Sequence, residues 1–203
     1  LAQALTLRGH RVAVVTEWLR EWCDRAGRTP RPDEQLAIAQ TQAARVVEAV
    51  AELAASASEA PAYVIADTTP VMTALYSDWL FNDKSLHAMA LAHQRTFTHT
   101  LVTGLDLPWV ADGLQRDGAH VREPIDAMLR ATLADGGVPY KVIYGSGQER
   151  VHNALLAIAA TPITPDTCIP TGSPARSPPW QWQCDKCSDP VCEHRLFSRI
   201  LKP

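Results

Sequence analysis

The chain has 203 residues, of which 46% are hydrophobic and 20% are charged, and its formal net charge is −3 at pH 7. This composition is ordinary for a globular protein, and the length accommodates one α/β core with an appended segment. The small negative charge argues against a nucleic-acid surface. No apolar run reaches the roughly 18 residues of a membrane-spanning helix, so no membrane association is predicted.

The first part of the chain predicts a helix, a strand, a long helix and a second strand in turn. Residues 1–7 resemble the end of a helix, and 11–16 is a β-branched run typical of a buried strand. Asp33 is suited to cap the long helix. Its apolar residues recur at helical spacing, at Leu36, Ala39, Ala43, Val46, Val50 and Leu53. Residues 63–67 form the second strand, which ends on a carboxylate.

The alternation continues beyond this strand. Two helices and a strand are predicted at 70–80, 85–97 and 99–103. A polar segment rich in Gly, Asp and Arg follows at 106–122. A helix, a strand and a last helix are predicted at 123–133, 141–144 and 148–160. Strands that alternate with helices predict an α/β fold, with a parallel sheet covered by helices on both faces.

Candidate functional residues follow the predicted strands. Ligands of such sheets bind beyond the carboxyl ends of the strands. Glu17 follows the first strand, Asp67 ends the second, and the polar segment 106–122 follows the third. We therefore expect the chemistry to lie along this edge of the sheet.

Three strings together resemble the ribosylnicotinamide kinase domain of bifunctional NAD-biosynthesis regulators and related AAA-type P-loop ATPases. The most specific is Pro-Trp-Val-Ala-Asp-Gly-Leu at 108–114, closely followed by arginines. Glu-Trp-Leu-Arg at 17–20 stands where that family has Glu-Tyr-x-Arg, and Asp-Thr-Thr at 67–69 stands where it tends toward Asp-Thr-Asp. The resemblance covers residues 1–160 and implies a P-loop NTPase-like fold, with ATP and Mg²⁺ as cofactors.

The P-loop itself is missing from the sequence. No G-x-x-x-x-G-K-[ST] string occurs in residues 1–203. In the family that it resembles, this loop comes just before a helix that begins like residues 1–5, so we expect it immediately upstream of Leu1. Thr69 also replaces the second carboxylate of the family's Asp-Thr-Asp string.

The residues at the strand ends have both catalytic and structural interpretations. Asp67 is placed to serve Mg²⁺, or else to cap the next helix. The resemblance implies that Glu17 accepts a proton from a substrate hydroxyl or orients the ribose. The alternative for Glu17 is a surface ion pair with Arg20 or Arg25, and Arg20 is itself a candidate substrate-binding residue.

The segment 106–122 has the character of a mobile lid. Arg116 and Arg122 are candidates to stabilise a transferring phosphoryl group, although a loop arginine is by default only solvated. Asp112 is a candidate to hold the lid and the substrate, or simply forms an Asp-Gly turn. Trp18 and Trp109 are candidates to stack on a base, with burial in the core as the alternative.

The C-terminal part has a separate character. Six prolines within 161–179 predict an extended linker between the domain at 1–160 and a tail at 180–203. In the tail, the spacing Cys-x2-Cys-x4-Cys-x-His is typical of a structural zinc site. Its candidate ligands are Cys184, Cys187, Cys192 and His194. Free thiols and a redox-active C-x-x-C pair are the alternatives.

The sequence thus favours a cytoplasmic, ATP-dependent kinase of a small nucleoside, ribosylnicotinamide by resemblance. The odd number of cysteines fits a reducing compartment better than a secreted disulfide framework. The alternative is a non-catalytic regulatory or interaction protein, with a degenerate nucleotide-binding fold and a zinc tail. Formation of a homo-oligomer is left open.

We predict that the tail binds one zinc ion and that the double variant Cys184→Ser/Cys187→Ser does not. The segment is too short to bury a core, so metal binding would supply its folding free energy, on the order of 10 kcal/mol in comparable sites. The measurement is the zinc content of both purified proteins. Equal zinc in the two, or none in either when purified without chelator, would remove the site.

Overall fold

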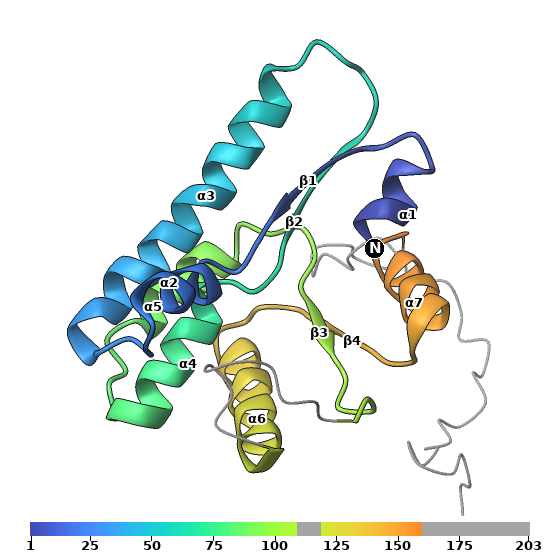
Figure 1. Ribbon diagram of the computed structural model, residues 1–203. Coiled ribbons are helices and arrows are strands. Elements are labelled where there is room, and N and C mark those ends of the chain that lie inside the picture. Colours follow the sequence, from blue (N-terminus) through green and yellow to red (C-terminus); the bar gives the residue numbers. More distant parts are fainter. Residues whose placement is uncertain (109–118, 160–203) are drawn as a thin grey trace, which may run out of the picture. The chain divides into compact units, whose positions relative to one another are not determined.

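The computed structural model describes residues 1–108 and 119–159 (Figure 1). In the first part the elements are α1 (Ala2–Thr6), β1 (Arg11–Val15), α2 (Trp18–Ala26), the 3-10 helix η1 (Pro32–Glu34), α3 (Gln35–Ala55) and β2 (Ala62–Ala66). They are followed by α4 (Pro70–Phe81), α5 (His87–Gln94), β3 (Leu101–Thr103), α6 (Ala119–Asp135), β4 (Lys141–Ile143) and α7 (Gly147–Ala159). The predicted helices and strands are present in the predicted order, with α2 in addition, and the α/β class is confirmed.

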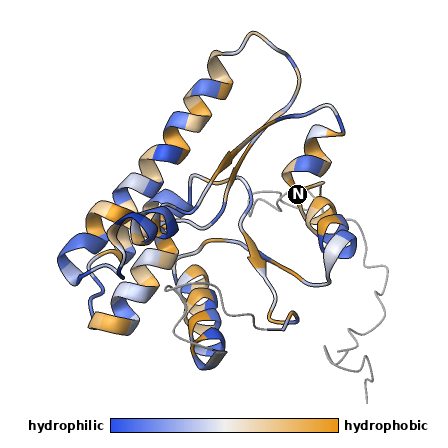
Figure 2. Cartoon of the chain, in the orientation of Figure 1, coloured by the Kyte–Doolittle hydropathy of each residue, from blue (hydrophilic) through white to orange (hydrophobic). Residues whose placement is uncertain are grey.

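All the strand pairs that the structure describes are parallel. β1 pairs with β2 over five residues, from Arg11 opposite Ala62 to Val15 opposite Ala66. β3 pairs with β4 over three residues. The expectation of one continuous sheet is not met within the described residues, where the strands form two separate two-stranded sheets. Figure 2 shows that the strands are mostly hydrophobic, as expected for strands covered on both sides.

Helix α2 was not predicted. Residues 18–26 do have apolar side chains at helical spacing, a pattern that the prediction did not use: Trp18, Leu19, Trp22, Cys23 and Ala26. The helix buries only Cys23. It ends at Gly27, which adopts the left-handed conformation (φ +65°) that suits a helix C-terminus. Its contacts with α3 include the hydrogen bonds from the Trp18 N–H to Gln42 and from Arg45 to Glu21.

The long helix α3 differs from the prediction in its start and in its buried face. Asp33 lies within η1 and does not cap α3. Glu34 closes this turn by accepting a hydrogen bond from the Arg31 N–H at 2.7 Å. Leu36 and Val50, which the apolar stripe placed in the core, are 47% and 51% exposed. Ala39 and Val46 of the predicted stripe are buried, and the buried face also contains Gln35, Ile38 and Gln42.

Helix α6 begins earlier than predicted: residues 119–122, which were expected to belong to the polar segment, are helical. Pro124 lies inside this helix, where it lacks the N–H that would donate to the carbonyl oxygen of His120. One hydrophobic cluster joins α4 and α5 through buried residues that include Val71, Leu75 and Ala90.

Among the helices of the described residues, none combines the length and hydropathy needed to cross a membrane.

A buried glutamine links the end of β2 to the start of β3. Gln94 is 4% exposed, and its Oε1 accepts a hydrogen bond from the Thr69 hydroxyl at 2.7 Å. Its Nε2 donates to the Thr100 hydroxyl at 2.9 Å. Both halves of the amide are therefore satisfied inside the protein, which fixes the turn after β2 against the strand that follows.

We predict that Gln94→Ala destabilises the chain by about 1–3 kcal/mol, because it leaves two threonine hydroxyls without their buried partner. The control is Gln40→Ala on the exposed face of α3, which should change stability by less than about 0.5 kcal/mol. The measurement is the urea unfolding midpoint. Equal midpoints for the two variants would contradict the role of Gln94.

Candidate functional site

The carboxyl ends of β1 and β2 lie next to each other. Val15 is opposite Ala66, and the Asp67 N–H donates to the Val15 carbonyl oxygen at 2.8 Å. The segments that follow the two strands, 16–18 and 67–69, therefore emerge side by side. The strand-end candidates Glu17 and Asp67 thus lie on the same edge of this sheet, as the sequence predicts.

Glu17 occupies the N-cap position of α2, and its side chain is 19% exposed. One carboxylate oxygen lies 3.6 Å from Nε of Arg20. The ion pair that was the structural alternative for Glu17 is therefore present, and it involves Arg20 rather than Arg25. Such a partly exposed pair is worth little in stability but sets the orientation of both side chains.

Trp18 contacts two arginines. The guanidinium of Arg45 lies 4.3 Å from the centre of the indole ring, and that of Arg25 lies 4.9 Å from it. Cation–π attraction of this kind favours a fixed ring. Trp18 therefore has a packing role at the strand end, and its stacking on a substrate base stays a prediction.

Glu21 is the centre of a charged network that the sequence did not identify. Its two carboxylate oxygens accept hydrogen bonds from Arg45 at 2.7 and 3.0 Å, and one also accepts from the Thr16 hydroxyl at 2.8 Å. Arg25 lies 3.5 Å away. The hydrogen bonds from Arg45, then from Thr16, lower the pKa of Glu21 to about 2.

Gln42 fixes the first turn of α2 from the neighbouring helix. Its Oε1 accepts a hydrogen bond from the Trp18 backbone N–H at 2.7 Å, and its side chain is 3% exposed. Only the spacing of Glu21 and Arg25 was visible in sequence, as an i, i+4 pair. The contributions of Gln42 and Arg45 depend on the packing of α3 against α2, which no local pattern reveals.

The turn after β2 combines an accessible carboxylate with a strained backbone. The Asp67 side chain is exposed and forms no hydrogen bond or ion pair with the residues that the structure describes. Thr68 has φ +64°, which is unfavourable for a β-branched residue. Thr69 is held by Gln94. Strain of this kind persists only where the surroundings enforce it, and it is concentrated at functional sites.

A second network joins the carboxyl ends of β3 and β4. Asp106 accepts hydrogen bonds from the Gly145 N–H at 2.6 Å and from Arg150. Desolvation opposes ionisation of Asp106, but the Gly145 hydrogen bond and the charge of Arg150 outweigh it and lower its pKa. Arg122, one of the two predicted lid arginines, donates to the Leu107 carbonyl. It therefore lies near the end of β3, held by a loop carbonyl.

Several predicted site residues lie outside the described residues. They are Trp109, Asp112 and Arg116 of the expected lid, and Cys184, Cys187, Cys192 and His194 of the expected zinc site. Across 1–108 and 119–159, no group of three or more His, Cys, Asp or Glu side chains is arranged to hold a metal ion. The zinc site and the domain boundaries near residues 160 and 180 stay predictions.

Comparison with known protein families decides the identity of this fold. An AAA domain family model matches residues 1–150. The chain belongs to the AAA domain family. This family is a group of P-loop NTPases, so the domain is a nucleotide-binding fold with an expected role in nucleotide binding and hydrolysis. No curated protein and no solved structure gives a significant match to the chain.

We predict that Glu21→Gln removes part of the acid sensitivity of the AAA domain. The folded pKa of Glu21 lies below its ordinary value of 4.5, so its ionised form stabilises the fold above that pH. This stabilisation is lost as the pH falls through about 2. Between about pH 5 and pH 2 the melting temperature of the wild type should therefore fall more than that of Glu21→Gln.

Glu52→Gln is the matched control, because Glu52 lies on the same helix as Arg45 and forms no ion pair with the described residues. This control should keep the acid sensitivity of the wild type. An identical loss of melting temperature in Glu21→Gln and the wild type would show that the Glu21 network does not form.

Proposed function

We propose that this AAA domain is the core of an ATP-dependent kinase that phosphorylates a small nucleoside, ribosylnicotinamide by resemblance. The observation that carries the proposal is the register of β1 and β2, which brings Glu17 and Asp67 to the same sheet edge. Phosphoryl transfer needs a phosphate cradle, a magnesium site and cations that stabilise the developing charge. The described residues supply candidates for the last two.

Asp67 fits a magnesium site by its chemistry. Its carboxylate is exposed and has no partner among the described residues, so its oxygens remain available to a hard cation. When bound, Mg²⁺ would neutralise charge on the ATP phosphates. The strained turn at Thr68 and the hydrogen bond from Thr69 to Gln94 would hold Asp67 in one position.

Glu17 would accept the proton of the attacking substrate hydroxyl. It lies at the first turn of α2, whose position is fixed by the Trp18–Gln42 hydrogen bond and by the Glu21–Arg45 pair. Arg20, paired with Glu17, would contact the substrate from the same turn. In this proposal the network around Glu21 does no chemistry and serves to orient Glu17.

The phosphate cradle would come from a segment outside residues 1–203. The sequence contains no P-loop motif, and the family that it resembles carries one on a central strand. The two separate two-stranded sheets support this proposal, because β2 and β3 each have one edge that is unpaired within the described structure. A parallel strand between them would complete a five-stranded sheet and place its P-loop at the carboxyl edge.

The test is an assay of magnesium-dependent ATP consumption with and without ribosylnicotinamide, with the phosphorylated nucleoside detected by mass spectrometry. The protein should be the complete gene product that contains this chain. ATP consumption that depends on the nucleoside supports the kinase. ATP consumption without the nucleoside indicates an ATPase that acts on another substrate. No consumption, together with no P-loop motif in the coding sequence, would replace the kinase by the regulatory or interaction protein.

We predict that in the complete protein Arg116→Ala and Arg122→Ala each lower kcat by about 10²-fold and weaken ATP binding less. A contact made mainly in the transition state has this effect. Arg95→Ala is the matched control for Arg122, because Arg95 also donates to a backbone carbonyl, that of Gly136, but precedes β3. Unchanged kcat in both lid variants, or an equal loss in the control, would overturn the lid assignment.

A further inference from the structure

The outer edge of β1 is unpaired. The Arg11 N–H donates to Pro61 and the Val15 carbonyl accepts from Asp67, so alternate residues of β1 direct their backbone groups to β2. The backbone groups of Val12 and Val14 between them therefore point to the opposite side. No strand of the described residues pairs with that side. Free N–H and C=O groups in a row form a template for an added strand.

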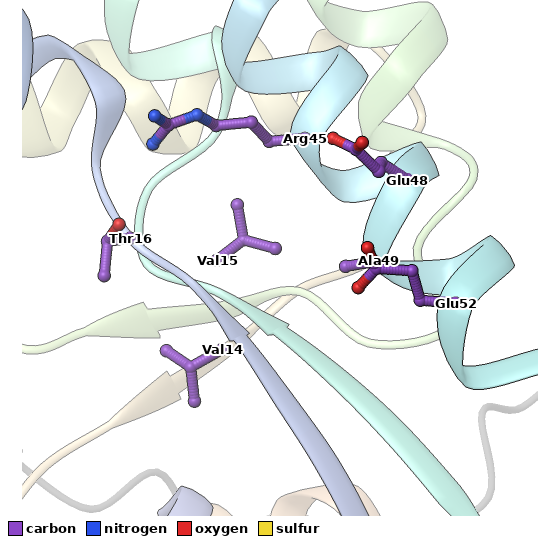
Figure 3. Close-up of a pocket in the computed structure, with 7 residues that line it drawn as sticks. All are labelled: Val14, Val15, Thr16, Arg45, Glu48, Ala49 and Glu52. Carbon is purple, nitrogen blue, oxygen red and sulfur yellow. The ribbon is translucent and has the colours of Figure 1, made fainter.

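A groove lies beside this edge. Its volume is about 210 Å³ (Figure 3). It is formed by Val14 and Val15 of β1, by Thr16 directly after this strand, and by Arg45, Glu48, Ala49 and Glu52 of α3. No residue of β2 lines it, and the groove lies between β1 and α3. Val14 is 52% exposed, and its side chain leaves β1 on the side opposite to that of Val15 (Figure 3). A groove between an edge strand and a helix suits an extended peptide.

The charge of the groove selects its occupant. Glu48 and Glu52 lie one turn apart on α3, and neither forms a hydrogen bond or ion pair with the described residues. The positive charge of Arg45 is already neutralised by Glu21, at 2.7 Å. The groove therefore has an excess of negative charge. Because burying a carboxylate opposite a like charge is unfavourable, its complement is a Lys or Arg side chain.

We propose that the outer edge of β1 binds an extended segment of a partner protein as an added strand, with a Lys or Arg side chain of that segment in the groove. The backbone of β1 would provide the hydrogen bonds, and Glu48 with Glu52 would select the basic residue. A nucleic acid is disfavoured because its phosphates would face these carboxylates. A second copy paired through the same edge would bring two Glu48–Glu52 pairs together.

This interaction does not rest on the proposed phosphoryl transfer, because neither ATP nor the strand-end carboxylates take part in it. The two sites share Thr16 and Arg45, which line the groove and also bind Glu21. The experiment measures the fluorescence anisotropy of a labelled peptide, Ser-Val-Thr-Val-Lys-Val-Thr-Ser, titrated with the complete protein that contains this chain. A second peptide has Glu in place of Lys. A third has N-methyl groups on alternate backbone nitrogens, which prevent strand pairing without changing the charge.

We expect saturable binding of the Lys peptide and none of the Glu or N-methylated peptides. The double variant Glu48→Gln/Glu52→Gln should weaken the Lys peptide by about tenfold or more. Asp33→Asn/Glu59→Gln is its control, since it removes the same charge from two exposed residues away from the groove. Circular dichroism of each variant verifies that the fold is retained.

Three outcomes would overturn the proposal. Equal binding of the Lys and Glu peptides would show that the groove does not discriminate between a positively and a negatively charged side chain. Absence of binding by the Lys peptide, or the same loss in the control variant, would show that the edge is not a peptide site. Sedimentation of the chain alone gives the third outcome, since a dimer that the Lys peptide dissociates would assign this edge to a second copy.

Discussion

The in-register parallel pairing of β1 with β2 is the constraint on which the candidate site depends. A shift by one residue would turn every side chain of a strand to the other face and would separate the two strand ends. With Val15 opposite Ala66, Glu17 and Asp67 leave the sheet together. The positions of α2 and of the turn after β2 follow from this pairing, because each begins directly at a strand end.

Different contacts hold the two halves of the candidate site, the segment after β1 and the segment after β2. On the side of β1, Glu21 and Arg45 are partly exposed, and such a pair contributes little net stability. The buried amide of Gln42, which accepts the Trp18 N–H, is the stronger restraint there. On the side of β2, Gln94 is buried and satisfied at both ends of its amide. In both halves a glutamine from a neighbouring helix holds the segment that follows a strand, Gln42 through a backbone N–H and Gln94 through threonine hydroxyls.

The sequence predicted the strands and the strand-end carboxylates, but it did not reveal the contacts made by these glutamines. The strands were predicted because short β-branched runs such as 11–16 and 63–67 have few other interpretations, and the strand-end carboxylates followed from topology. The buried face of α3 was predicted only in part: Ala39 and Val46 are on it, but an apolar pattern does not identify its members Gln35 and Gln42. Arg45 joins Glu21 across 24 positions of sequence, a contact that only the packing of α2 against α3 creates.

The character of each unpaired strand edge indicates what it accepts. β2 reads Ala-Tyr-Val-Ile-Ala and β3 reads Leu-Val-Thr, without a charge that would oppose pairing. Edges of this kind aggregate unless they are covered, so they suit a permanent strand of the same fold. The outer edge of β1 has Glu48 and Glu52 beside it, and charge is a common means of preventing unspecific strand addition. The same carboxylates attract a basic segment. They can therefore keep the empty edge from pairing with unrelated strands and still favour a segment that carries Lys or Arg.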